Sequence, residues 1–260
     1  MVTIERVEKG RSRYYEVTGD PSGTLQLPSV TTVLGIIAKP ALVGWAKKIS
    51  LEKVRAELEM LNAPSQFSQE WIDNLIEAAR KRPDQVRDEA SEWGTEAHLR
   101  LSDYIEGKRE SWEIESEYMT VIHGYDQWLE ENSLVVDRTE WMVYSPEGYA
   151  GTVDIGGVSK AGVKFIADLK TGSGVYKEAA LQLAAYAKAD SEMTLVPVEE
   201  AWILHIPRKQ PDFSAAGSAY NKNKSSFTAH LLTAEQLEMS AASFLAALRL
   251  YTGLKEKLWD

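Results

Sequence analysis

Three short extended segments follow one another between residues 138 and 171, and this run constrains the fold more than any other part of the sequence. The segment TEWMVY alternates apolar and polar residues, YAGTVDIGGV follows after a Pro-Glu-Gly turn, and VKFIADLKT follows after the turn SKAG. Alternation with period two is typical of strands, and turns this short join antiparallel neighbours. The sequence therefore predicts a three-stranded antiparallel meander.

The segment after the meander predicts a crossover connection. A helical pattern runs from Tyr176 to Ala189, and the apolar strand AWILHI follows at 201–206. A strand that returns to the same sheet across a helix runs parallel to the strand before it. A further strand, SFTAHLL, and a closing helix from Ala234 to Lys257 end the sequence pattern. We therefore expect an α/β fold with a central mixed β-sheet flanked by helices.

Helical patterns dominate the first half of the sequence. After an opening hairpin with a turn at 19–23, a helical pattern starts behind Pro28 and Ser29, pauses at 39–40 and resumes. Apolar residues three and four apart predict further amphipathic helices at 68–81, 83–106 and 118–131. We expect one domain over 1–260, in which 1–132 form a mainly helical cap or wall and 133–260 form the sheet with its flanking helices.

Composition limits the possible cofactors and partners. The chain has no cysteine, so a disulfide, an iron-sulfur cluster and a thiolate zinc site are impossible, and any metal must be bound by oxygen or imidazole. No apolar stretch reaches the roughly 18 residues that span a bilayer, and no signal peptide is evident, so we expect a cytoplasmic protein without a membrane partner. The net charge of −10 argues against a protein that coats nucleic acid, but not against an enzyme that contacts DNA locally.

Three charged residues on the second and third predicted strands are candidates for chemistry. Asp168 and Lys170 are two apart, so both side chains lie on one face of their strand. Asp154 ends the preceding strand, and the hairpin brings it close to Asp168, with Gly151 allowing close backbone approach. Two carboxylates about 4–6 Å apart raise each other's pKa, and a divalent cation reverses that cost. Because the strand is otherwise apolar, we interpret these residues as the rim of a cleft rather than as an exposed ion pair.

Several ordered motifs resemble the PD-(D/E)XK nuclease superfamily, and its RecB-like branch in particular. They are GTVD, ending at Asp154; IADLKTG, containing Asp168; and QLAAY, ending at Tyr186. Upstream, GTEAH is similar to the helical histidine motif of that branch, and LPSVTTVLGIIAKPALVGWAKK is similar to the opening of many bacteriophage-encoded members. Val153 stands where the superfamily name has proline, which is a common variant.

The resemblance implies a restriction-endonuclease-like core and a set of metal ligands. His98, Asp154, Asp168 and the backbone carbonyl of Leu169 would bind Mg²⁺, with Mn²⁺ as a substitute and without an iron-sulfur cluster. Lys170 would orient the attacking water or stabilise the charge of the transition state, and hydrolysis would leave no covalent intermediate.

The resemblance also places further residues at the site. Gln182 and Tyr186 are four apart on one helix face, and both would position DNA, with core packing as the alternative for Tyr186. Glu140 is either an additional acidic site residue or a solvent-facing one. His123, His205 and His230 are interpreted as structural. Weaker candidates for DNA contact are Tyr176, Lys47, Lys48, Arg208 and Lys209.

These residues predict a metal-dependent deoxyribonuclease. We favour an exonuclease that resects linear DNA in phage-type recombination, replication or repair, where a phage single-strand annealing protein would be a partner. Two alternatives stay open at this point: a structure-specific or single-strand endonuclease on the same scaffold, and a catalytically silent DNA-binding protein. The residues do not distinguish strand preference, polarity, DNA from RNA, the number of metals or the oligomeric state.

Overall fold

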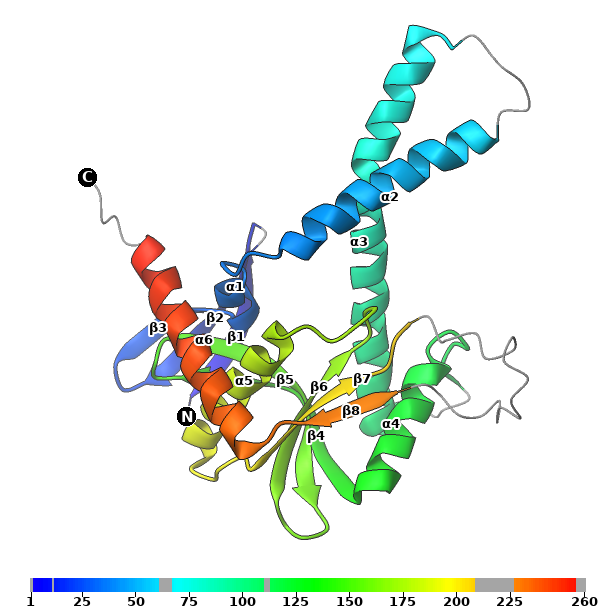
Figure 1. Ribbon diagram of the computed structural model, residues 1–260. Coiled ribbons are helices and arrows are strands. Elements are labelled where there is room, and N and C mark those ends of the chain that lie inside the picture. The colour runs from blue at the N-terminus through cyan, green and yellow to red at the C-terminus, as the bar shows by residue number, and fades with distance from the viewer. Residues whose placement is uncertain (1, 11, 61–66, 110–112, 209–226, 256–260) are drawn as a thin grey trace. The chain divides into compact units, whose positions relative to one another are not determined.

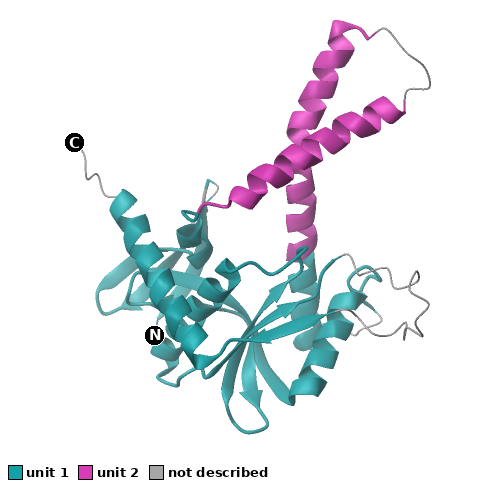
Figure 2. Cartoon of the chain, viewed as in Figure 1, with its two compact units in different colours: residues 1–37, 96–260 teal, residues 38–95 magenta. Residues whose placement is uncertain are grey.

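The computed structural model describes residues 2–10, 12–60, 67–109, 113–208 and 227–255 (Figure 1). By its internal contacts the chain divides into two compact units, one made of residues 1–37 with 96–260 and the other of residues 38–95 (Figure 2). This division does not test whether 1–260 act as one nuclease domain, which stays a prediction. No helix in the described part of the chain is long and apolar enough to cross a membrane.

A five-stranded mixed sheet forms the centre of the larger unit, with the strand order β4-β5-β6-β7-β8. Its strands are β4 (Leu134–Ser145), β5 (Tyr149–Ser159), β6 (Lys164–Lys170), β7 (Glu200–His205) and β8 (Thr228–Leu231). The first three strands pair antiparallel, and β7 pairs parallel to β6 after the crossover helix α5 (Glu178–Thr194). The predicted meander, the crossover and the mixed α/β sheet are confirmed.

Helices cover both faces of this sheet. Successive residues of β6 point to opposite faces, and here Ile166 joins the core cluster with α5 and with α6 (Ala234–Lys255) (Figure 1). Its neighbour Phe165 instead packs edge-on against Trp128 of α4 (Met119–Asn132), with ring centroids 5.9 Å apart. A strand buried on both faces needs apolar residues at every position, which explains the continuous apolar run before Asp168.

The N-terminal region holds a second sheet that was not fully predicted. Strands β1 (Thr3–Lys9), β2 (Ser12–Asp20) and β3 (Gly23–Pro28) form a three-stranded antiparallel sheet. The expected opening hairpin with its turn at 19–23 is confirmed by the pairing of β2 with β3, and Gly23 adopts a φ of 109° there. The additional strand at residues 3–9 was not predicted. Tyr15 and other apolar residues of this sheet pack against Ala150 of β5.

The long helix α3 (Gln69–Ile105) also differs from expectation. Two helices were expected, at 68–81 and 83–106, but α3 continues through Pro83 as one element. A proline removes one hydrogen bond of a helix without ending it where the flanking turns continue the pattern. The predicted interruption between α1 (Val30–Leu34) and α2 (Pro40–Glu59) is confirmed, but it spans residues 35–39, and Pro40 already belongs to α2. Ser29 caps α1 by accepting a hydrogen bond from the Thr32 amide.

Candidate active site

The first part of the site lies where β5 and β6 pair. Ile155 pairs with Ala167, so the register places Asp154 opposite Asp168 on the neighbouring strand. Asp154 lies within β5 rather than at its end, which corrects the sequence expectation, but its predicted closeness to β6 is confirmed. Its Oδ2 accepts a hydrogen bond of 2.8 Å from the Leu169 amide, which fixes the carboxylate against the next strand.

A network of side chains surrounds the buried carboxylate of Asp168. Lys170 Nζ lies 2.6 Å from Asp168 Oδ2, and Gln182 Nε2 donates to Asp168 Oδ1 at 3.1 Å. Gln182 also accepts from Lys170 at 3.2 Å and donates to the Tyr186 hydroxyl at 3.1 Å. Asp168 Oδ2 is buried, and the ammonium of Lys170 is the group that lies against it. The carboxylate is thus held by charge and hydrogen bonds from two side chains.

The second part of the site joins helix α3 to strands β4 and β5. His98 Nδ1 lies 3.5 Å from Asp154 Oδ2 and 3.6 Å from Glu140 Oε1. One ligand atom from each of these three residues lies within 4.8 Å of the others. Two donors each about 2.1 Å from one metal ion lie about 3.0–3.4 Å apart at octahedral to tetrahedral angles. The three side chains can therefore hold one divalent cation after small adjustments.

Burial of Asp154 and Asp168 close together makes their negative charges unfavourable. Burial raises the pKa of Asp168 to about 6, with the charge of Lys170 opposing the rise and that of Asp154 adding to it. Burial also raises the pKa of Asp154, against the charge of His98. Burial lowers the pKa of His98, but Asp154 and Glu140 outweigh it and raise the value to about 9. A divalent cation would relieve the crowding of carboxylates and replace the proton on the imidazole.

The pKa of Lys170 is raised, whereas burial lowers the pKa of an isolated amine. Burial alone would lower its pKa, but the charges of Asp168 and Asp154 outweigh burial and raise it. Lys170 is thus protonated at neutral pH. In the metal-free protein it can therefore donate hydrogen bonds and offer positive charge.

Tyr186 packs inside the core rather than lining an open surface. Its side chain is only 5% exposed, and its ring occupies the space beside Gly151, where a Cβ atom would lie 2.3 Å from the ring. Close approach at Gly151 was predicted and is confirmed. The burial agrees with the core-packing alternative for Tyr186, which reaches the site through its hydrogen bond with Gln182.

The candidate DNA contacts are spread over both units. Tyr176 is 63% exposed between β6 and α5, and the Arg208 amide donates to the Thr171 carbonyl at 3.0 Å, just after Lys170. Lys47 and Lys48 are exposed on α2 in the smaller unit, and Lys48 pairs with Glu52 at 3.7 Å. Lys209, with most of the 207–226 loop, lies outside the described residues. DNA contact by any of these residues stays a prediction.

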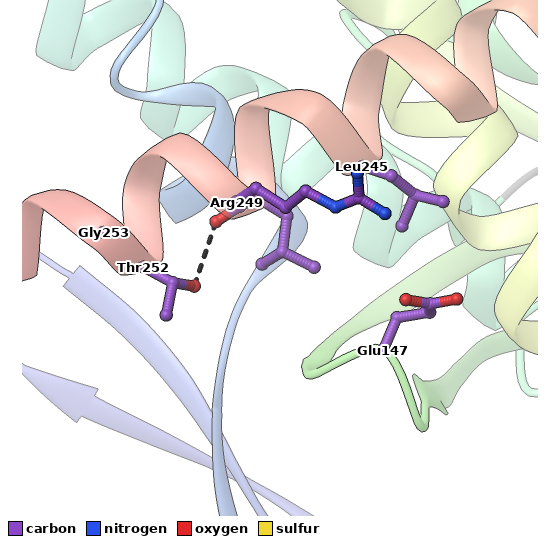
Figure 3. Close-up of a pocket in the computed structure, with 6 residues that line it drawn as sticks. Glu147, Leu245, Arg249, Thr252 and Gly253 are labelled. Carbon is purple, nitrogen blue, oxygen red and sulfur yellow. Dashed lines mark hydrogen bonds between the residues drawn. The ribbon is translucent and has the colours of Figure 1, made fainter.

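A pocket of about 340 Å³ lies elsewhere on the larger unit, between α6 and the turn that joins β4 to β5 (Figure 3). The described residues that line it are Glu147, Leu245, Leu248, Arg249, Thr252 and Gly253, and they include none of the candidate site residues. The Thr252 hydroxyl donates to the Leu248 carbonyl at 2.9 Å and is thereby satisfied within its own helix (Figure 3).

Comparisons with known proteins give distant similarities. No family model matches the chain, and no curated protein sequence does. The chain is similar to the crystal structure of SSO0001, at 13% identity and a TM-score of 0.34, over 80% of this chain and 85% of that chain. It is also similar to a protein from Eubacterium rectale named "putative exonuclease", at 12% identity and a TM-score of 0.39, over 63% of this chain and 71% of that chain. Similarities this distant carry no argument about function.

Proposed function

We propose that the protein is a metal-dependent deoxyribonuclease of the PD-(D/E)XK type and of its RecB-like branch. The observation that carries this proposal is that His98, Asp154, Asp168 and Lys170 come from three elements and gather at one place. The same residues occupy the ordered motifs that resemble the superfamily. An ordinary surface ion pair would leave Asp168 in solvent, whereas its carboxylate is 1% exposed.

The donor set suits a hard divalent cation. His98, Asp154, Asp168 and the carbonyl of Leu169 would hold it, and carboxylate oxygens favour Mg²⁺, with Mn²⁺ tolerated by the imidazole. When bound, the metal supplies Lewis acidity at the scissile phosphate and lowers the pKa of a coordinated water. The Leu169 amide orients Asp154 for this task, because it fixes one carboxylate oxygen by a hydrogen bond.

Lys170 would stabilise negative charge on the phosphate or orient the attacking water. Its ammonium, held 2.6 Å from Asp168, suits the role of a hydrogen-bond donor and a positive charge. Gln182 would hold this ammonium in position, since it contacts both Lys170 and Asp168. A group held in place before substrate arrives costs no reorganisation in the transition state.

We further propose exonuclease action on linear DNA, which rests on the resemblance to bacteriophage-encoded members. The test uses end-labelled linear duplex, single strands and closed circular DNA, each with Mg²⁺, with Mn²⁺ and with EDTA. Metal-dependent loss of linear DNA alone supports the exonuclease, and nicking of closed circles means an endonuclease on the same scaffold. A protein that binds these DNAs and cuts none of them with either metal is the catalytically silent alternative.

A further inference from the structure

Glu140 has a backbone conformation that side chains seldom adopt within a strand. Its φ is 48°, in the left-handed region, between the pairs of Thr139 with Ile155 and of Trp141 with Val153 and shortly after a register shift between Val136 and Arg138. A residue other than glycine persists in this region only where its surroundings determine it, and such residues cluster at functional sites.

The unusual backbone brings two consecutive side chains to the same helix. In a regular strand, Thr139 and Glu140 would point to opposite faces of the sheet. Here the hydroxyls of Thr139 and Ser102 lie 2.6 Å apart, and the carboxylate of Glu140 lies 3.6 Å from His98. His98 and Ser102 are one turn apart on α3, so they lie on one helix face. The carboxylate of Glu140 thus lies beside the imidazole, and the strand register places Glu140 opposite Asp154.

The residues next to Glu140 are firmly held. Trp141 donates through Nε1 to the buried carboxylate of Asp190 at 3.0 Å, and its ring fills the space beside Gly156, where a Cβ atom would lie 2.4 Å from the ring. The guanidinium of Arg138 lies 4.3 Å from the centre of the same ring. Glu140 itself keeps 40% of its side chain exposed, so it adds little to packing. Its carboxylate therefore acts through its contact with His98 rather than through burial in the core.

We propose that Glu140 is a ligand of the bound metal, together with His98 and Asp154. This inference rests on the proposed metal site and adds a carboxylate from β4 to the ligands that the family resemblance implies. Three donors of the right kind converge there, one imidazole nitrogen and two carboxylates. A further hard oxygen ligand strengthens the preference for Mg²⁺ and Mn²⁺.

The test measures Mn²⁺ binding to the full chain without DNA, by calorimetric titration. Glu140→Gln should weaken binding at least about tenfold, in the range that perturbing a metal site commonly costs. Glu147→Gln, the same change in the β4–β5 turn, should bind as wild type. Glu140→Gly accommodates the backbone conformation but removes the carboxylate, so it should also weaken Mn²⁺ binding at least about tenfold.

The outcomes separate the inference from the proposed function. Wild-type Mn²⁺ affinity in Glu140→Gln overturns the inference, whether or not the protein cleaves DNA. A lower metal-free Tm in Glu140→Gly with unchanged Mn²⁺ affinity overturns it too, since Glu140 would then serve the fold. If Glu140→Gln binds Mn²⁺ more weakly but the wild-type protein cuts no DNA, Glu140 is a metal ligand and the proposed nuclease function is refuted. If the wild-type chain binds no Mn²⁺, both the ligand role of Glu140 and the proposed metal-dependent nuclease are refuted.

Discussion

The ammonium of Lys170 lies 2.6 Å from the carboxylate of Asp168, two residues before it on β6. The intervening Leu169 points the other way and is buried, so strand geometry alone brings the acid and the amine together. Gln182 contacts both of them from α5, with its amide nitrogen on Asp168 and its oxygen on Lys170. The positions of Asp168 and Lys170 are therefore fixed both by the strand β6 and by Gln182 of the helix α5.

Replacing Lys170 should affect the chemical step more than metal binding. Lys170→Met removes the positive charge but keeps a side chain of similar length, so kcat should fall about 10²- to 10³-fold, as for other preorganised charge-stabilising groups. The Mn²⁺ affinity should not weaken, because the lost ammonium would repel the cation. Steady-state cleavage and a Mn²⁺ titration on the same preparation measure both. A kcat close to wild type would rule out the role given to Lys170.

Gln182 should act through Lys170 and Asp168 rather than by binding DNA. Gln182→Leu removes its hydrogen bonds with Lys170, Asp168 and Tyr186, so we expect kcat to fall about 10- to 100-fold with little change in KM. Gln127→Leu on α4 serves as the control and should match wild type in both parameters. A raised KM with an unchanged kcat would show instead that Gln182 contacts the substrate.

The close contact between Gly151 and Tyr186 predicts a specific loss of stability. In Gly151→Ala the new methyl group would overlap the buried ring, so unfolding should become easier by about 1–3 kcal/mol. Combining it with Tyr186→Leu should cost less than the sum of the two single changes, because the overlap disappears. Gly174→Ala, with open space around its Cβ position, should leave Tm unchanged. If the losses of stability from Gly151→Ala and Tyr186→Leu were fully additive, the close contact between these two residues would be contradicted.

The raised pKa of His98 predicts how pH affects the protein. Its folded value of about 9 exceeds the ordinary 6.5, so the charged imidazole stabilises the metal-free fold. That contribution is complete below pH 6.5 and is lost as the pH rises through about 9. Metal binding must displace the same proton, so Mg²⁺ affinity should rise with pH across this window.

His98→Gln provides the comparison for this pH dependence. Three carboxylates, those of Asp154, Glu140 and Asp168, act on His98 in the metal-free protein. The variant should show a shallower rise of Mg²⁺ affinity between pH 6.5 and 9 and a smaller loss of metal-free stability over the same range. Parallel curves for wild type and variant would mean that His98 does not exchange a proton for the metal.

The parts of the fold that follow from local patterns could be predicted from the sequence. Alternation and short turns predicted the meander, and the helix between two apolar strands predicted the parallel pairing of β6 with β7. The approach of Asp154 to Asp168 followed from the antiparallel pairing of β5 with β6 in the meander. The single helix through Pro83 could not be predicted, because a proline signals a boundary locally while helical residues continue on both sides.

Glu140 shows where local reasoning stops. Its left-handed backbone has no signal in the sequence, since neither glycine nor asparagine stands there. Its neighbours are held by Ser102 and by Asp190, which lie 37 residues before Thr139 and 49 residues after Trp141. Contacts that distant along the chain fix the strand on either side of Glu140, and sequence spacing carries no information about them.

Metal-dependent cleavage by site variants tests the central claim most directly. Wild type, Asp154→Asn, Asp168→Asn and the exposed control Asp137→Asn are incubated with end-labelled linear duplex and Mg²⁺, with and without EDTA. We predict that wild type and Asp137→Asn degrade the DNA, that EDTA stops both, and that the other two variants are at least about 10²-fold slower. Undiminished cleavage by Asp168→Asn, or intact DNA with wild type in Mg²⁺ and in Mn²⁺, would contradict the account.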